Sequence, residues 1–337
     1  MSKFKILVVY HKKAPMFKNE VLEPIHAGRS CADEASKDGM LPRDDYDWLC
    51  RKMIGDDTGG GQNNISHLNR DINEWSVIYW AWKNYEKLGN PDYIGLMHYR
   101  RLFDFRGVVN TDRCSYAGAL GLKKKYLKKI FTKYDFVYRN GFHVKDKTLH
   151  TFEPYQLEAK LSDDNHPLLY NEYLKFNAEQ IFYPNNIFIM KKDDFFGFCK
   201  ESFDLMMEIL CLSKEERMKT FVKWVKDNCS KDRYDRFYQA YKKNKDYQPR
   251  HISYLMEYVS SFYFMYLRDK YKDRALECKI LFTEPPKFIS LHRHKVIKLL
   301  VKVLVNGKKY KKFKKDPNSF FADSKSRFIK ILGKYYN

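Results

Sequence analysis

NPDYIGLMHYRR, residues 90–101, is the stretch that decides the fold. Residues 93–97 form an apolar run typical of a short buried strand, and His98, Arg100 and Arg101 follow it almost at once. In open α/β sheets, ligands bind in the crevice beyond the carboxyl ends of the strands. Two guanidinium groups, which stay charged and offer forked donors, favour a phosphate or diphosphate ligand there, together with the imidazole.

A second cationic group follows the first predicted strand. Residues 5–10, KILVVY, are continuous, apolar and β-branched, as in a strand that is buried on both faces, and His11 and Lys12 come next. Both side chains are candidates for the same ligand. The alternative for the arginines is pairing with surface acids such as Asp44 or Asp45.

The order of elements places the first 100 residues in the α/β class. Residues 64–84 carry apolar side chains at three- and four-residue steps, which predicts an amphipathic helix between the two strands. Strand, loop, helix and strand in this order are typical of a sheet with parallel strands. We also expect a long surface loop at 31–63, strands at 135–138 and 184–191, and helices at 126–134, 193–212 and 251–268.

The net charge of the 337-residue chain is +21, and much of it lies near the C-terminus. Residues 287–337 hold fifteen Lys or Arg and only two acids. An apolar segment at 296–305 stands beside the polybasic GKKYKKFKK, and this composition favours an anionic membrane surface. A solvated tail is the alternative.

Seven scattered cysteines without a CxxC pair argue against a disulfide framework or a zinc site and favour a reducing compartment. The N-terminal apolar run is too short for a signal peptide, and no stretch approaches the roughly 20 apolar residues of a membrane span. We therefore expect a cytoplasmic protein that is peripheral on the inner face of the cell membrane.

Three polar residues at the start of the 64–84 helix are candidates for a binding site. Asn64, Ser66 and Asn69 stand where backbone N–H groups favour anions, and the amides can contact a base or a ribose. Ordinary helix capping is the alternative.

Three carboxylates are candidates for a general base, namely Asp163, Asp164 and Glu257. Glu257 lies in an otherwise apolar, aromatic helix, where a carboxylate must be paired, exposed or functional. A structural pair with Arg250 is the alternative. The sequence contains no Walker A loop, GxGxxG or HExxH motif, and no DxD motif follows residues 93–97.

Several segments, taken in order, resemble a family of bacterial glycosyltransferases of capsule, exopolysaccharide and O-antigen synthesis. The family was long described as a domain of unknown function, and some members are β-1,3-galactofuranosyltransferases. The matching stretches cover most of residues 3–270 and are KILVVYHKK, PIHAGRS, DDTGGGQNNISHLNRDINEWSVIYWAWKN, DYIGLMHYRRLF, PNNIFIMKK and YQPRHISYLMEYV. The YWAWKN and YIGLMHYRR blocks together are a specific signal.

The resemblance implies a GT-A-like fold, in which a nucleotide-sugar-binding sheet is flanked by helices and followed by a helical acceptor region. Residues 1–286 would form the glycosyltransferase domain, with the nucleotide-binding part at about 1–140 and the acceptor part at 141–286. Residues 287–337 would form a basic, amphipathic tail for membrane association.

The resemblance also implies the reaction. A sugar, galactofuranose or another hexose, would move from a UDP-sugar to a hydroxyl of a lipid-linked or growing surface polysaccharide, with inversion. In most GT-A enzymes a DxD motif holds a metal against the diphosphate, and here HYRR occupies that place. His98, Arg100 and Arg101 would then neutralise the diphosphate directly. No metal cofactor is expected, although Mn or Mg stays open.

The roles of the site residues follow from the same resemblance. Glu257 is the first choice for the general base, with Asp163 or Asp164 next. In the family Glu257 begins a Glu-Arg-Leu segment, which is Glu257-Tyr258-Val259 here, so any role of that arginine is in doubt. The nucleotide would contact His11, Lys12, Asn64, Ser66 and Asn69, and the acceptor or donor sugar would contact Asn185, Asn186 and Arg250.

Two other classes stay open from the sequence. The charge and the many Tyr and Phe residues would suit a nucleic-acid-binding protein, although no DNA or RNA module is recognised and no nucleic-acid partner is expected. Selective binding of UDP over random oligonucleotides would exclude that class. A non-catalytic scaffold would bind membranes through its tail without binding a nucleotide.

Overall fold

A mostly parallel sheet positions the candidate site. The computed structural model describes residues 3–34, 40–107, 120–144, 157, 160–211, scattered positions between 219 and 239, and 247–282, of which 247–251 are described without their side chains. Residues Met1–Leu281 form one compact unit and Phe282–Asn337 a second. The tail predicted at 287–337 lies outside the described residues.

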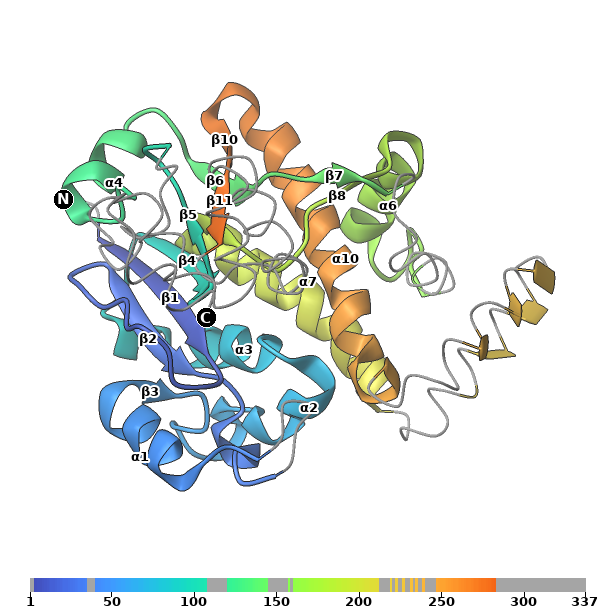
Figure 1. The fold of residues 1–337 in the computed structure, drawn as a ribbon. Coiled ribbons are helices and arrows are strands. Elements are labelled where there is room, and N and C mark those ends of the chain that lie inside the picture. Colours follow the sequence, from blue (N-terminus) through green and yellow to red (C-terminus); the bar gives the residue numbers. More distant parts are fainter. Residues whose placement is uncertain are drawn as a thin grey trace, which may run out of the picture. The chain divides into compact units, whose positions relative to one another are not determined.

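The sheet has nine strands among the described residues, in the order β10-β6-β9-β4-β1-β2-β3, with β5 pairing with β4 and β11 (Figure 1). The strands are β1 (Phe4–Tyr10), β2 (Leu22–His26), β3 (Ile54–Gly55), β4 (Tyr93–His98), β5 (Arg101–Phe103), β6 (Phe136–Arg139), β9 (Phe188–Lys191), β10 (Ala275–Cys278) and β11 (Ile280–Phe282). A separate pair joins β7 (Phe142–His143) to β8 (Ile181–Phe182).

Strand directions bring one turn to the edge where the parallel strands end. β1 is parallel to β2 and β4, and β6 is parallel to β10, whereas β9 runs antiparallel to its neighbours β4 and β6. Phe188, which begins β9, is paired with both Leu96 of β4 and Tyr138 of β6. The turn before Phe188 therefore lies beside the carboxyl ends of β4 and β6.

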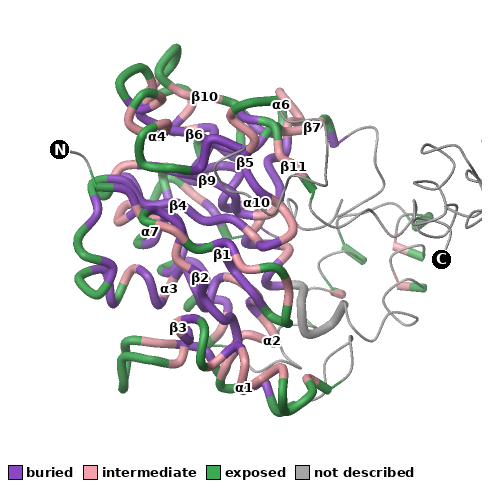
Figure 2. Tube along the Cα trace, turned by 60° about the vertical axis from the view of Figure 1, so that its left-hand side comes forward, coloured by how far each residue is buried: buried purple, intermediate pink, exposed green. Residues whose placement is uncertain are grey.

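Both faces of the sheet are buried, which explains the unbroken apolar runs. Alternate residues of β1 belong to two hydrophobic clusters, with Leu7 and Val9 in one and Ile6 and Val8 in the other. The central strands are buried along almost all of their length (Figure 2). Gly95 of β4 keeps the β4–β9 contact close, since a Cβ there would lie 2.7 Å from the Phe188 carbonyl oxygen.

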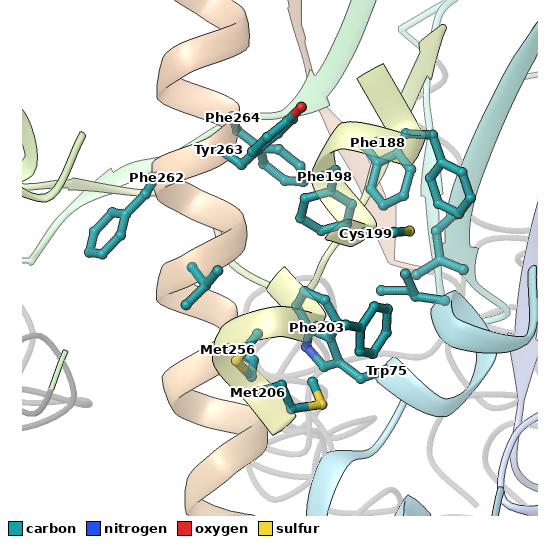
Figure 3. Packing of buried hydrophobic residues seen from close by; sticks show 14 of the residues in the cluster. Trp75, Phe188, Phe198, Cys199, Phe203, Met206, Met256, Phe262, Tyr263 and Phe264 are labelled. Carbon is teal, nitrogen blue, oxygen red and sulfur yellow. The ribbon is translucent and has the colours of Figure 1, made fainter. Parts of the chain in front are cut away.

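Helices from distant parts of the chain build the larger cluster. Trp75 of α3 packs against Phe198 and Phe203 of α7 with ring centroids 5.4 and 5.5 Å apart, and Met256 of α10 lies nearby (Figure 3). The helices are α1 (Arg43–Lys52), α2 (Asn69–Ile72), α3 (Trp75–Lys83), α4 (Lys124–Ile130), α6 (Pro167–Glu179), α7 (Lys192–Leu210) and α10 (Tyr247–Tyr271). None in the described part of the chain is both long and apolar enough to cross a membrane.

The expected α/β class, with a sheet flanked by helices, is confirmed. The strands predicted at 5–10 and 93–97 are parallel neighbours, and the predicted helices at 193–212 and 251–268 correspond to α7 and α10. The surface loop expected at 31–63 is wrong, because it contains α1 and β3. Helix α1 has acids in its first turn and bases in its last turn, an order that complements the helix dipole.

Asparagines with a positive φ shorten two other predicted elements. The helix expected at 64–84 is divided at Asn73, which has φ 51° and separates α2 from α3. The strand expected at 184–191 begins only at Phe188, because Asn185 and Asn186 have φ values of 70° and 49°. Asparagine reaches a positive φ more readily than most other residues, although Asn73, with ψ −130°, lies outside the left-handed helical region.

Candidate active site

Eight residues from five parts of the chain meet at the carboxyl edge of the sheet, and we call them the strand-end cluster. Strand β4 and the residues after it supply His98, Arg100 and Arg101, and β6 supplies Arg139. The turn before β9 supplies Asn185 and Asn186, and Glu74 caps α3 while Glu257 lies on α10. Arg139 and Glu74 were not predicted, although Arg139 ends an apolar strand as His98 does.

Asn185 is held from three sides. Its backbone N–H donates to Glu257 Oε2 at 3.1 Å, and its carbonyl oxygen lies 3.0 Å from His98 Nε2. Arg139 Nη1 donates to the side-chain oxygen Asn185 Oδ1. This one residue therefore contacts three other members of the strand-end cluster and fixes their spacing.

Asn186 is fully buried and belongs to the scaffold of the site. Its Nδ2 donates to Glu74 Oε1 at 2.8 Å, and its Oδ1 accepts a hydrogen bond from Ser260 Oγ of α10. With 0% of its surface exposed, this side chain has no area to offer a sugar in the present conformation. The expected sugar contact therefore fits Asn185, which is partly exposed, better than Asn186.

His98 supplies no positive charge. Burial, and then repulsion from Arg101, Arg100 and Arg139, lower the pKa of His98 to about 3, so the imidazole is neutral at physiological pH. Its Nε2–H donates to the Asn185 carbonyl, and Glu74 Oε1 lies 3.8 Å away. A neutral ring offers no charge to a diphosphate, so His98 positions the turn in this structure, and its predicted contact with a diphosphate stays a prediction.

The three arginines of the strand-end cluster have no ion-pair partner within the described part of the chain. No carboxylate of the described residues lies within 4.0 Å of Arg100, Arg101 or Arg139, and Asp45 pairs with Lys13 at 3.4 Å instead. The Nε atoms of Arg100 and Arg139 are buried without a hydrogen-bond partner. Burial and the neighbouring Arg100 hold the pKa of Arg101 below its ordinary value, which shows that like charges are crowded here.

Two carboxylates balance part of this charge. Glu74 is 11% exposed at its side chain, and burial raises its pKa against the opposing effect of the hydrogen bonds from its own amide and Asn186. Glu257 is partly exposed, and both carboxylates favour the charged form of Arg101. A carboxylate that borders the arginines and has some exposure can reach a ligand, so Glu257 keeps its candidacy as a base.

The residues predicted at the helix start lie mainly in a buried network. Ser66 Oγ donates to Asp56 Oδ1 at 2.6 Å and has no exposed surface, while Ser76 Oγ donates to Asp56 Oδ2. Asn69 Nδ2 donates to Ser76 Oγ and to a backbone carbonyl, and Asn64 Nδ2 donates to the Asp57 carbonyl. Asn64 Oδ1 accepts the Ser66 backbone N–H at 3.4 Å, at the start of the 3-10 helix Ser66–Leu68, and Ser66 has no surface to offer a nucleotide.

The segment PIHAGRS forms a second buried group at the ends of β2 and β3. Arg29 Nε donates to His26 Nδ1 at 3.3 Å and Arg29 Nη2 donates to the Met53 carbonyl at 2.9 Å. Burial and the charge of Arg29 lower the pKa of His26 to about 3. Gly28, with φ 68°, gives its N–H to Asp56 Oδ2 at 2.7 Å, so this motif holds the strand ends together.

The remaining predicted residues lie on exposed segments or outside the described side chains. His11 and Lys12 are exposed after β1, and the His11 ring lies 5.5 Å from that of Tyr99. Asp163 and Asp164 occupy an exposed turn before α6. The side chain of Arg250 is outside the described residues, so its pairing with Glu257 is untested.

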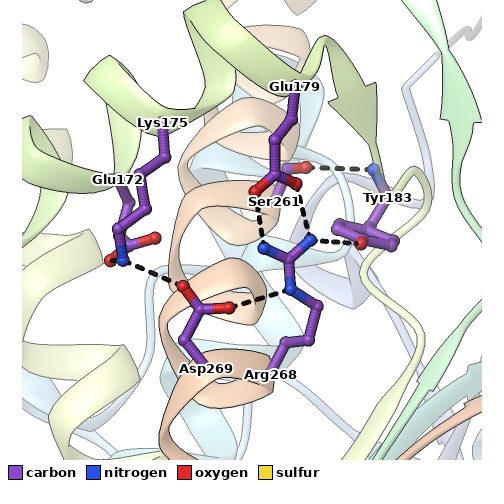
Figure 4. A network of polar contacts seen from close by, with 7 residues as sticks. All are labelled: Glu172, Lys175, Glu179, Tyr183, Ser261, Arg268 and Asp269. Atoms are coloured by element: carbon purple, nitrogen blue, oxygen red, sulfur yellow. Dashed lines mark hydrogen bonds and ion pairs between the residues drawn. The ribbon is translucent and has the colours of Figure 1, made fainter. Parts of the chain in front are cut away.

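A polar network between α6 and α10 holds Tyr183, which precedes the Asn185–Asn186 turn. Arg268 binds Glu179 through two N–H···O contacts of 2.7 and 2.8 Å and donates to the Tyr183 hydroxyl, while Ser261 Oγ accepts from the Tyr183 backbone N–H (Figure 4). Lys175 joins Glu172 to Asp269 in the same network. Tyr183 stands two residues before Asn185, so the network anchors the start of the turn.

The family of the chain follows from its sequence. Residues 5–223 match the profile of the family described as Domain of unknown function (DUF4422). The chain belongs to this family. No curated protein matches it.

One solved structure is similar to this member of the family. It is the apo structure of the bifunctional glycosyltransferase WbbM, with a TM-score of 0.57 and 20% sequence identity, and the match covers 84% of this chain. The chain spans about half of that protein, 46% of its length. The likeness shows a shared fold. No group of three or more His, Cys, Asp or Glu side chains suited to a metal occurs within the described residues.

Proposed function

We propose that this protein is a glycosyltransferase that moves a sugar from a UDP-sugar to a hydroxyl of a glycan. One observation carries the proposal. Arg100 and Arg101 follow a buried parallel strand at the edge where α/β sheets bind ligands, and no carboxylate of the described residues pairs with them. Unpaired guanidinium groups there suit a diphosphate. The fold shared with a glycosyltransferase supports the same reading.

The reaction would be a single displacement. Glu257 would accept the proton of the acceptor hydroxyl. The oxygen of that hydroxyl would form a bond to the anomeric carbon of the sugar at the same time. The bond from that carbon to the diphosphate breaks, and the departing UDP keeps the electron pair. Fixed cations aimed at a developing negative charge lower the barrier most when they are already in place, as Arg100 and Arg101 are. The anomeric centre would be inverted.

Glu257 is a better candidate base than Asp163 or Asp164. Its Oε2 lies 3.1 Å from the Asn185 backbone nitrogen, and its charge acts on Arg101 and Arg139. The two aspartates lie in an exposed turn before α6. His11 and Lys12, which follow the neighbouring strand β1, would meet the nucleotide.

The finer assignments are part of the same proposal. Galactofuranose or another hexose would be the donor sugar, and a lipid-linked or growing surface polysaccharide of capsule or O-antigen type would be the acceptor. Residues 287–337, with fifteen basic side chains and two acids, would hold the protein at the inner face of the cell membrane. The acceptor would be found at that surface.

Calorimetric binding of UDP, in EDTA and then in manganese, tests the proposal. We expect binding in EDTA that Arg100→Ala/Arg101→Ala weakens by about a hundredfold, because removing partners of a bound charge costs several kcal/mol. Arg51→Ala, at an exposed position of α1, is the matched control and should bind as the wild type does. Binding of random oligonucleotides in preference to UDP, or no UDP binding in either buffer, would contradict the proposal.

A further inference from the structure

We infer that Arg139, rather than His98, is the third cation of the anion site and contacts the diphosphate beside Arg100 and Arg101. The inference deepens the proposed function and rests on it. Nothing in the sequence motifs points to Arg139, because it comes about 40 residues after HYRR in the chain.

The sheet brings Arg139 to the site. Strands β6 and β4 flank β9, and Tyr138 and Leu96 are both paired with Phe188. Arg139 is the last residue of β6, just as His98 is the last residue of β4. Asn185 lies between these two strand ends, since it accepts from Arg139 through its side chain and from His98 through its backbone.

The contacts of Arg139 leave one side of its guanidinium group unused. Nη1 donates to Asn185 Oδ1, whereas Nε is buried and has no hydrogen-bond partner among the described residues. Nη2 makes no hydrogen bond to the described residues. The Nε–Nη2 edge is one of the two-donor edges with which arginine binds two oxygens of a phosphate. Asn185 therefore holds the fork in place, and its Nε–Nη2 edge has no hydrogen-bond partner among the described residues, although Nε is buried and an anion would have to approach this edge from the Nη2 side.

The burial of Arg139 is costly without a ligand. The residue is 9% exposed, and no carboxylate of the described part of the chain lies within ion-pair distance of it. Burial, and then the charge of Arg101, lower the pKa of Arg139 to about 10, so the group stays charged at neutral pH. A buried charge without a partner destabilises a fold, and a doubly charged anion would remove that penalty.

His98 cannot take this role in the observed arrangement. Its ring is neutral, and its Nε2–H is committed to the Asn185 carbonyl. The residues at the two strand ends therefore have different roles. His98 positions the Asn185 turn through a hydrogen bond, and Arg139 supplies a positive charge for the anion.

The test uses Arg139→Met, Arg139→Lys and His98→Gln in the full chain, with Arg51→Met as the control for a lost surface charge. Melting temperature and calorimetric affinity are measured with inorganic pyrophosphate and with UDP as probes. We expect Arg139→Met to melt at or above the wild-type temperature without a probe, because an unpaired buried charge has been removed. It should also lose the stabilisation by either probe and bind UDP at least about tenfold more weakly.

The other variants separate binding from structure. Arg139→Lys keeps the charge but loses the fork, so its affinity should lie between those of wild type and Arg139→Met. His98→Gln removes the imidazole but can still donate to the Asn185 carbonyl, so it should weaken UDP binding less than Arg139→Met does. Wild-type affinity in Arg139→Met overturns the inference and leaves the proposed function intact. A wild-type protein that binds neither probe refutes the proposed function itself. A melting temperature of Arg139→Met well below that of the wild type, with unchanged affinity in Arg139→Lys, assigns Arg139 to the scaffold and also overturns the inference.

Discussion

At the scale of single residues, burial decides which side chains of the strand-end cluster carry charge. His98 and Arg139 end the two strands that flank β9 and are both largely buried, yet only the arginine keeps its proton, because its ordinary pKa is so much higher. A sequence shows both as basic residues. The difference between a neutral donor and a cation appears only once the surroundings of each group are known.

The neutral state of His98 predicts a pH dependence of stability. The pKa of His98 is about 3 in the folded chain and near the ordinary 6.5 in the unfolded chain. Between these two pH values, His98 is protonated in the unfolded chain and neutral in the folded chain. The contribution of neutral His98 to the free energy of unfolding is therefore fully present above pH 6.5. It falls by about 1.4 kcal/mol per pH unit as the pH drops toward 3. Urea unfolding of wild type and His98→Gln at pH 7.5 and pH 5 measures this contribution.

The variant should lose less stability than the wild type between the two pH values. His26, whose pKa is also about 3, keeps its own contribution in both proteins and is the internal reference. Parallel pH profiles for wild type and His98→Gln would mean that His98 is accessible to protons in the folded chain, contrary to this prediction.

At the scale of elements, one face of α10 carries a row of polar side chains that hold loops from other parts of the chain. Ser253 binds Asn73, Glu257 binds Asn185, Ser260 binds Asn186 and Arg268 binds Glu179. The spacing of these residues along the helix keeps them near one another on its surface. The aromatic side chains of the same helix fill the core, so α10 joins the hydrophobic cluster to the site.

This role of α10 predicts different outcomes for two buried serines. Ser260→Ala leaves Asn186 Oδ1 buried without its donor and should lower the free energy of unfolding by about 1–3 kcal/mol. Ser202→Ala on α7 is the matched control, because Ser202 Oγ is buried and already has no partner among the described residues. Its free energy of unfolding should stay equal or rise. Equal losses in both variants, measured by denaturant titration, would show that the contact to Asn186 contributes nothing.

Helices and strands could be predicted from the sequence where the spacing of apolar residues was regular. The prediction failed where a single asparagine ends or divides an element. The two-sided burial of β1 and β4 produces apolar runs that can be recognised without a structure. The break at Asn73 and the turn at Asn185 depend on hydrogen bonds to Ser253 and Glu257, which lie some 180 and 72 residues further along. Such contacts leave no periodic signal.

At the scale of the whole molecule, contacts between distant residues also limit how much of the site can be predicted from the sequence. HYRR lies at the carboxyl end of β4, as expected, because strand ends can be placed from the local pattern. Arg139 and Glu74 reach that edge through strand order and helix packing, which no short motif contains. Conversely, Ser66 looked functional as a polar residue near a helix start, and its burial against Asp56 could not be seen locally.

The division of the chain into two units predicts separable functions. A chain that lacks 287–337 should bind UDP as the full chain does, because the strand-end cluster lies wholly within Met1–Leu281. It should sediment much less with vesicles that contain anionic lipid, since each basic residue near such a surface contributes about 1 kcal/mol. Neutral vesicles are the control. Equal sedimentation of both chains with anionic vesicles would remove the tail from the proposal.

The turn at Asn185 and Asn186 has a consequence for the newly made chain. Its partners are residue 74 from the first third of the chain, residues 98 and 139 further on, and residues 257 and 260 near the end of the first unit. A ribosome releases the last of these long after the sheet has its first strands. The turn thus has its full set of partners only when α10 has emerged, and under the proposed function we expect no nucleotide binding by a nascent chain before its first unit is nearly complete.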